Sequence, residues 1–223
     1  DTGHPDLCGF EALDGVEKTL RIPWRNIEVF LSHFHDDHDG NLLYCVQKGA
    51  SKLYSGPTQI DSRALIDNFL VLSSSADLKS DSASSFIRLV AAGKKAQTYT
   101  QGSRIELHGG ETLSIAGYYF DVLLTPGHTS NHLCLLDKSK KIFFAGDHIC
   151  DAPPGCMQYA INDHLIARYL ESLAQLKELN LQAVYMCHHN PLRGSFEINR
   201  FISLIEGRYE TLVIRARKLF ADH

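Results

Sequence analysis

The sequence predicts an α/β fold, and three features of the chain lead to this class. An apolar strand at 27–32 is followed by a loop, a helix and a second strand, which is the arrangement of a parallel α/β unit. From about residue 97 the pattern changes to short β-type runs separated by turn residues. Helical spacing returns after residue 163. We therefore expect sheets that are covered by helices.

The first part of the chain predicts two strands and three helices. The run 27–32 is almost continuously apolar and rich in β-branched and aromatic residues, as in a buried strand. A helix is expected over 41–49, because Gly49 can end it, and a strand over 52–56. Two further helices are expected at 57–72 and 82–93.

The second part predicts a β-meander and then two helices. Helices are expected at 164–179 and from about 195 to 220, with the strand 182–187 between them. We expect the apolar stripe of the last helix to pack in the core; contact with a partner chain is the alternative. The strands of the meander are expected at 98–100, 104–107, 112–115, 118–125, 132–137 and 141–146.

Composition indicates an ordinary globular protein. The 223 residues are 44% hydrophobic and 22% charged, and they show neither a repeat nor a linker, which predicts a single domain over 1–223. No run approaches the roughly 20 apolar residues that cross a bilayer. The six cysteines form no C-x-x-C pair and predict buried free thiols in a reducing compartment. We expect a cytoplasmic protein without a membrane partner.

The charge balance bears on nucleic acid. There are 22 basic and 26 acidic residues, so the formal net charge is −4. Binding to phosphates would call for Lys and Arg gathered on one face. Nucleic acid is therefore not the expected partner, although this charge excludes only a broad basic surface and not RNA itself.

Candidate metal ligands are concentrated directly after the first strand. The segment SHFHDDHDG contains His33, His35, Asp37 and His38. Residues two apart on an extended chain point to the same side, so the first two imidazoles should lie together. We expect the next two residues on a turn, with a helix starting just after them. Mixed nitrogen and carboxylate ligands suit a borderline divalent cation such as Zn²⁺ or Fe²⁺.

With three later segments, TPGHTSNH (125–132), FFAGDH (143–148) and YMCHHNPLRG (185–194), the chain resembles the metallo-β-lactamase superfamily of metallohydrolases. The resemblance spans residues 28–194 and implies a four-layer αββα sandwich. Members commonly carry Asp-Thr-Gly after several early strands, whereas this sequence begins with it. We therefore expect the first strands of the fold to be missing, through truncation, processing or a reduced first sheet.

The resemblance also implies the ligands of two metal ions. His33, His35 and His128 would hold one ion, Asp37, His38 and His188 the other, and Asp147 would bridge both. The last ligand departs from the usual Pro-Gly-His-Gly pattern, so His189 is an alternative. Its neighbour Cys187 is expected to pack as a small hydrophobic residue rather than to bind metal. His132 and His148 could either orient ligands or simply pack.

The activity implied is that of a dinuclear metal-dependent hydrolase with a small-molecule substrate. A metal-bridging hydroxide would attack an ester, thioester or lactone carbonyl, with Asp37 as the catalytic residue that orients it and carries its proton. Zn is the expected metal, with Fe or Mn as alternatives. The aspartate at 147, where a true β-lactamase has cysteine, points to the glyoxalase II and general hydrolase branches. A homodimer is possible, since an unpaired sheet edge invites a second chain.

Three other functions stay open. The first is a phosphodiesterase or ribonuclease of the same fold. The second is a persulfide dioxygenase with one iron ion, an oxidoreductase; the related flavodiiron enzymes resemble H-x-E-x-D, whereas position 35 is histidine here. The third is a non-catalytic binding or regulatory protein, which the complete ligand set argues against.

Overall fold

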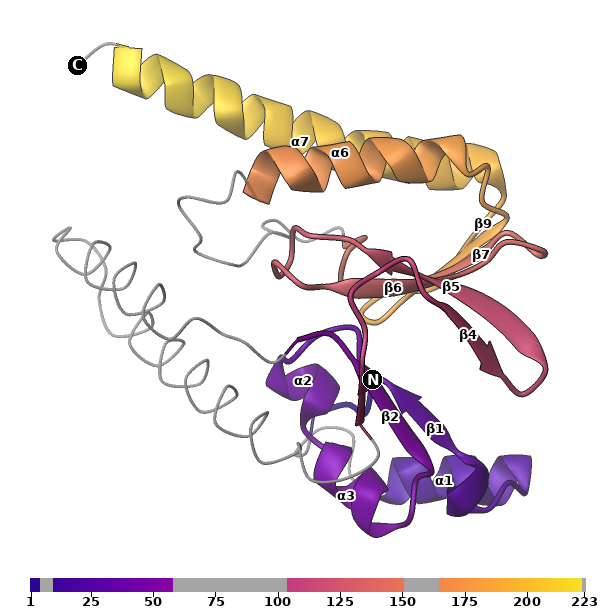
Figure 1. Ribbon diagram of the computed structural model, residues 1–223. Helices are drawn as coiled ribbons and strands as arrows, with labels where there is room; N and C mark the ends of the chain where they lie inside the picture. Colours follow the sequence, from indigo (N-terminus) through magenta and orange to yellow (C-terminus); the bar gives the residue numbers. More distant parts are fainter. Residues whose placement is uncertain (5–9, 58–103, 151–164, 222–223) are drawn as a thin grey trace, which may run out of the picture. The chain divides into compact units, whose positions relative to one another are not determined.

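The computed structural model describes residues 1–4, 10–57, 104–150 and 165–221. They form two compact units, one with the described residues up to Gly109 and the other with those from Gly110 (Figure 1). We call them unit 1 and unit 2. The single-domain organisation over 1–223 stays a prediction.

Unit 1 contains a parallel three-stranded sheet in the order β1-β2-β3. Val29 of β1 pairs with Leu53 of β2, and Tyr54 of β2 pairs with Ile105 of β3. One side of this sheet carries a small core that includes Trp24. The elements are α1 (Phe10–Leu20), η1 (Trp24–Asn26), β1 (Glu28–Phe30), α2 (Asp36–Asp39), α3 (Leu42–Gln47), β2 (Lys52–Ser55) and β3 (Arg104–Glu106).

The predicted strand, helix and strand of this unit are confirmed as β1, α3 and β2, each somewhat shorter than expected. The expected meander strand at 104–107 is a strand, but its assignment to the meander is wrong. As β3 it pairs in parallel with β2. Parallel neighbours are joined by long connections, so a local sequence pattern cannot reveal which sheet such a strand joins. Two helices, α1 and α2, were not expected.

Unit 2 contains a six-stranded sheet in the order β4-β5-β6-β7-β8-β9. Neighbouring strands are antiparallel except β7 and β8, which run parallel. The predicted meander strands from 112 to 146, the strand at 182–187 and both last helices are confirmed. The elements are β4 (Thr112–Ile115), β5 (Tyr118–Leu124), β6 (Leu133–Asp137), β7 (Ile142–Gly146), α6 (Leu165–Glu178), β8 (Ala183–Met186), β9 (Leu192–Arg193) and α7 (Ser195–Ala221).

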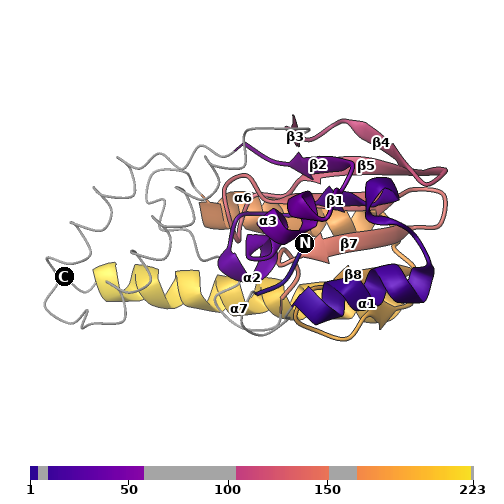
Figure 2. The ribbon, with the colours of Figure 1, turned by 90° about the horizontal axis from the view of Figure 1, so that it is seen from below.

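The core of unit 2 lies between its sheet and two helices that run side by side, α6 and α7 (Figures 1 and 2). Phe143 and Val184 from the sheet meet Tyr169 from α6 and Ile202 from α7 in one apolar cluster. The stripe of α7 packs in this core only as far as Tyr209. Two later members are exposed, Leu212 by 48% and Leu219 by 67%, so the expectation of core packing fails for this end of the helix.

Some expectations fall outside the described residues. These are the helix at 57–72 beyond its first residue, the helix at 82–93 and the strand at 98–100. In the described part of the chain, no helix combines the length and the apolar character needed to span a bilayer. The four described cysteines are free, two of them buried (Cys45 and Cys134).

Replacing Gly127 by alanine should destabilise the protein. An added Cβ would lie 2.2 Å from Cδ2 of Tyr169, whose ring is fully buried and has no room to swing away. Overpacking of this kind costs about 1–3 kcal/mol. Urea unfolding should therefore show a lower free energy of unfolding for G127A. The control is G207A in α7, where a Cβ meets nothing within 4 Å, and its stability should stay equal or rise.

The stability of the protein should fall in alkali because of Cys45. Burial raises the pKa of this thiol from its ordinary value of 9.0 to about 11. Between these two values the unfolded chain loses the proton while the folded chain keeps it, so stability falls as the pH rises from 9 to 11. The loss should reach about 2 kcal/mol at pH 11. Urea unfolding of wild type and C45A at several pH values measures this loss, because the difference between their free energies of unfolding should shrink as the pH rises from 9 to 11. A difference that stays constant would contradict the prediction.

Candidate metal centre

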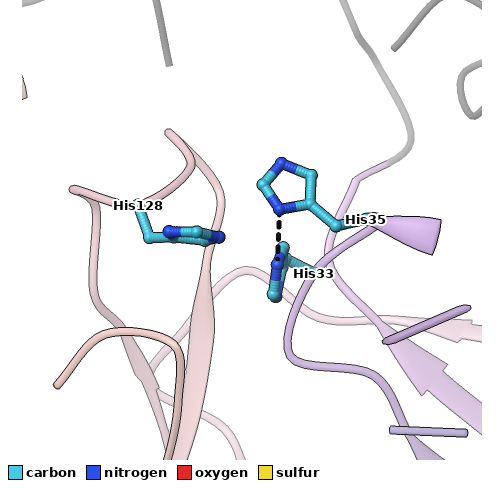
Figure 3. A group of neighbouring side chains, drawn as sticks. All are labelled: His33, His35 and His128. Atoms are coloured by element: carbon cyan, nitrogen blue, oxygen red, sulfur yellow. Dashed lines mark hydrogen bonds between the residues drawn. The ribbon is translucent and has the colours of Figure 1, made fainter. Parts of the chain in front are cut away.

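Unit 1 contributes a histidine loop that follows β1. The chain stays extended after the strand, with Leu31 N–H donating to the Tyr54 carbonyl at 2.8 Å. His33 is buried, and its Nε2 lies 2.9 Å from Nδ1 of His35 (Figure 3). The expectation that both imidazoles point to one side is therefore confirmed. Nitrogen atoms of two rings meet at one place, as they would around a shared cation.

The acidic stretch after these histidines forms α2 and not the expected turn. The backbone N–H groups of His38 and Asp39 both donate to the His35 carbonyl at 2.9 Å, which closes a helical turn. The helix thus starts within the cluster, not after it. His38 is buried, and its Nε2 lies 3.5 Å from Oδ2 of Asp37. An imidazole and a carboxylate are therefore held together on one short helix.

Asp1 contacts this loop from another part of the chain, and the sequence analysis gave it no role. Its carboxylate accepts hydrogen bonds from the Ser32 N–H at 2.8 Å and from the Ser32 hydroxyl at 2.9 Å. Its Oδ2 also lies 3.1 Å from Nδ1 of His38. Such a carboxylate orients the imidazole so that Nε2 is presented for other contacts. The Asp-Thr-Gly pattern was a signal that could have revealed this residue.

Thr2 and Asn41 also anchor this loop. Thr2 donates to the His38 carbonyl through its N–H at 2.6 Å and its hydroxyl at 2.9 Å. Asn41 in turn donates through Nδ2 to the Thr2 carbonyl at 2.9 Å. Both side chains are buried. The histidine loop of unit 1 is therefore held at His38 by buried hydrogen bonds.

Unit 2 contributes three residues from three separate loops. β5, β7 and β8 run in the same direction, so their carboxyl ends lie at one edge of the sheet. His128 follows β5, Asp147 follows β7 and His188 follows β8. Asp147 Oδ2 lies 3.5 Å from Nε2 of His128 and 3.3 Å from Nε2 of His188. A nearly buried carboxylate thus sits between two imidazoles.

His188 and His189 are the alternative last ligands at this edge. His188 reaches Asp147, since its Nε2 lies 3.3 Å from Oδ2 of that carboxylate. Cys187 is exposed, so the expectation that it packs as a small hydrophobic residue is wrong. Its backbone is held instead, because its N–H donates to the Gly146 carbonyl at 3.2 Å.

Two further histidines, His132 and His148, are fully buried beneath this edge. His132 Nε2 accepts a hydrogen bond from the Asp147 backbone N–H at 3.2 Å. His148 faces α6, where its Nε2 lies 2.9 Å from the Ser172 hydroxyl and its carbonyl accepts from the Tyr169 hydroxyl. Burial lowers the pKa of His148 to about 3. His148 is therefore neutral at physiological pH and serves the packing of the loop on α6.

The donor set of each unit fits a divalent metal ion. In unit 1, ring nitrogens gather on one loop beside a carboxylate; in unit 2, a carboxylate oxygen is within 3.5 Å of two ring nitrogens. Imidazole nitrogen and carboxylate oxygen are the ligands that Zn²⁺, Fe²⁺ and Mn²⁺ share. Buried groups of this kind need a partner of opposite charge or a hydrogen bond.

Comparisons with known structures bear on the fold. A metallo-β-lactamase family protein of Thermus thermophilus matches 95% of this chain and 70% of its own, at 17% identity and a TM-score of 0.74. A β-lactamase domain protein of Burkholderia ambifaria matches 98% and 66%, at 16% identity and 0.72. Rubredoxin oxygen:oxidoreductase of Desulfovibrio gigas matches 94% and 50%, at 13% identity and 0.59. These likenesses show a shared α/β fold.

The family itself is shown by the sequence. The family model described as "Metallo-beta-lactamase superfamily" matches residues 1–188, which is most of the chain. The match includes the histidine loop of unit 1 and all three ligand candidates of unit 2. This chain is a member of the metallo-β-lactamase superfamily.

Proposed function

We propose that this protein is a metal-dependent hydrolase whose centre combines the ligands of both units. His33, His35 and His128 would hold one ion, Asp37, His38 and His188 the other, and Asp147 would bridge them. The observation that carries the proposal is the position of Asp147 Oδ2, 3.5 Å and 3.3 Å from ring nitrogens of two histidines that lie far apart in the sequence. The pairing of these residues with the histidine loop is the one that the resemblance to the family implies.

The two carboxylates of this centre differ in exposure, which supports different roles for them. The Asp37 side chain is 36% exposed, whereas that of Asp147 is 9% exposed. A carboxylate that reaches solvent can accept a proton from an attacking water and pass it on. A buried one is better suited to holding a cation permanently. We therefore assign the proton transfer to Asp37 and the bridging position to Asp147.

Two divalent ions, zinc in our proposal with iron or manganese as alternatives, would lower the pKa of a water molecule and polarise the bond to be broken. The residues of the chain would do the rest. Asp37 would orient the water and take up its proton, and Asp1 would keep the His38 ring in place through its contact with Nδ1 at 3.1 Å.

The proposed substrate is a small ester, thioester or lactone. Position 147 is an aspartate, which separates this chain from the true β-lactamases of the resemblance. The chain has an acidic excess of charge, so a broad surface for phosphate backbones is not supported. Cleavage of a phosphodiester and oxidation of a persulfide are the competing activities, and both enter the test below.

Metal content and a substrate panel test the proposed reaction. The purified protein should contain about two ions per chain. It should cleave one of an ester, thioester or lactone set faster than a phosphodiester or a cephalosporin. H35A should lose activity by at least about 100-fold, because a metal ligand is removed. The control is H108A, which removes an exposed histidine of the same unit that faces Glu106.

Three results of that panel would count against the proposal. Equal rates for wild type and H35A would leave no role for the metal. Cleavage confined to the phosphodiester would favour the nuclease activity. One tightly held iron ion with oxygen consumption on a persulfide would favour the dioxygenase.

The assignment of the last ligand has its own test. H188A should weaken zinc binding by about 10- to 100-fold, because Asp147 loses its neighbour at 3.3 Å. H189A is the matched variant, one residue further along the chain, and should bind zinc as the wild type does. Competition with a chromophoric chelator measures both affinities. The opposite ranking would transfer the ligand role to His189.

A further inference from the structure

A buried chain of hydrogen bonds runs beneath Asp147 in unit 2. The Asp147 backbone N–H donates to His132 Nε2 at 3.2 Å, and His132 Nδ1 lies 3.0 Å from the Thr125 hydroxyl. The same hydroxyl lies 3.0 Å from Cys134 Sγ, and this thiol donates to the Ala145 carbonyl at 3.4 Å. The side chains of this network are buried, and His132 and Cys134 are fully so.

The chemistry of these groups determines where each proton lies. A backbone N–H can only donate, so His132 Nε2 must be the unprotonated nitrogen of a neutral ring. Nδ1 then carries the proton and donates it to the Thr125 hydroxyl oxygen. Burial also raises the pKa of the Cys134 thiol well above its ordinary range, so the thiol keeps the proton that it donates to Ala145. The direction of donation is therefore defined for both ring nitrogens of His132 and for the bond from Cys134 to Ala145.

The two ends of this chain hold the backbone at the end of β7 and at the start of the loop that follows it. One end is the Asp147 N–H and the other is the Ala145 carbonyl, two residues earlier. The far side is anchored in the loop 125–132, because the Thr125 N–H donates to the His132 carbonyl at 2.8 Å and so closes this loop. His128 lies in the same loop. The network thus connects the backbones that present two of the proposed ligands.

We infer that His132 is a positioning residue that fixes the Asp147 backbone, and with it the direction of the bridging carboxylate, through the acceptor at Nε2. The inference rests on the proposed function, because it gives Asp147 the role of a metal ligand. His132 acts on Asp147 through the main chain, because it accepts the bond from the Asp147 N–H. A carboxylate that must reach two ions tolerates little rotation, so loss of this bond weakens metal binding even when the fold survives.

The alternative is that His132 only fills space in the core. Three variants separate the two roles. H132L fills a similar volume and removes the acceptor. H132Q keeps an acceptor, since its amide oxygen can take the position of Nε2. L136A creates a cavity at a core residue of β6, the strand that also carries Cys134, and removes no hydrogen bond of this network.

The test measures zinc affinity by chelator competition, the visible absorption spectrum of the cobalt-loaded protein, and urea unfolding of the metal-free protein. We expect H132L to bind zinc about 10- to 100-fold more weakly and to show an altered cobalt spectrum, as for other residues that support metal ligands. H132Q should restore the affinity to within about threefold and restore the spectrum. L136A should lose stability but keep both the affinity and the spectrum.

The outcomes distinguish this inference from the proposed function. If wild type binds neither zinc nor cobalt, the proposed function fails and the inference fails with it. If wild type binds and H132L binds equally well, or if H132Q loses as much affinity as H132L, the positioning role alone is overturned. Should H132L not fold, T125V takes its place, because it removes the hydroxyl that accepts from Nδ1 at nearly constant volume. It should lower zinc affinity, and an unchanged affinity would overturn the role.

Discussion

The common direction of β5, β7 and β8 is the constraint on which the candidate centre depends. Each strand ends at the same edge of the unit 2 sheet, and a ligand candidate follows each of them within four residues. Strand pairing therefore brings together side chains that lie some sixty positions apart, from 128 to 188. The loops themselves need only be short and firmly held. That explains why buried hydrogen bonds are concentrated beneath them.

Much of this could be predicted from the sequence, because the decisive signals are local. The period of two along an extended chain was enough to place His33 and His35 on one side. The apolar runs that end in Gly-Asp and in His-His indicated strands with a polar residue at the end. Such patterns need no knowledge of the partner strand.

Other features depended on contacts that no local pattern contains. The pairing of β3 with β2 is made across a long connection, and local alternation is the same in either sheet. The roles of Asp1 and His132 arise from neighbours 31 and 15 positions away, Ser32 and Asp147. The exposed end of α7 continues the helical stripe without a break, so its periodicity suggested core packing as far as Leu219, whereas the core ends at Tyr209.

The irregularity in the pairing of β7 with β8 has a consequence for how this fold can vary. The register shifts between Phe144 and Gly146, and Gly146 has a φ of 51°, a conformation that side chains disfavour. Because side chains alternate along a strand, losing or gaining one residue there would turn the following aspartate to the opposite face. The spacing from this irregularity to position 147 is therefore fixed by the sheet, whereas a change of length in the turn before β7 would leave it unaltered.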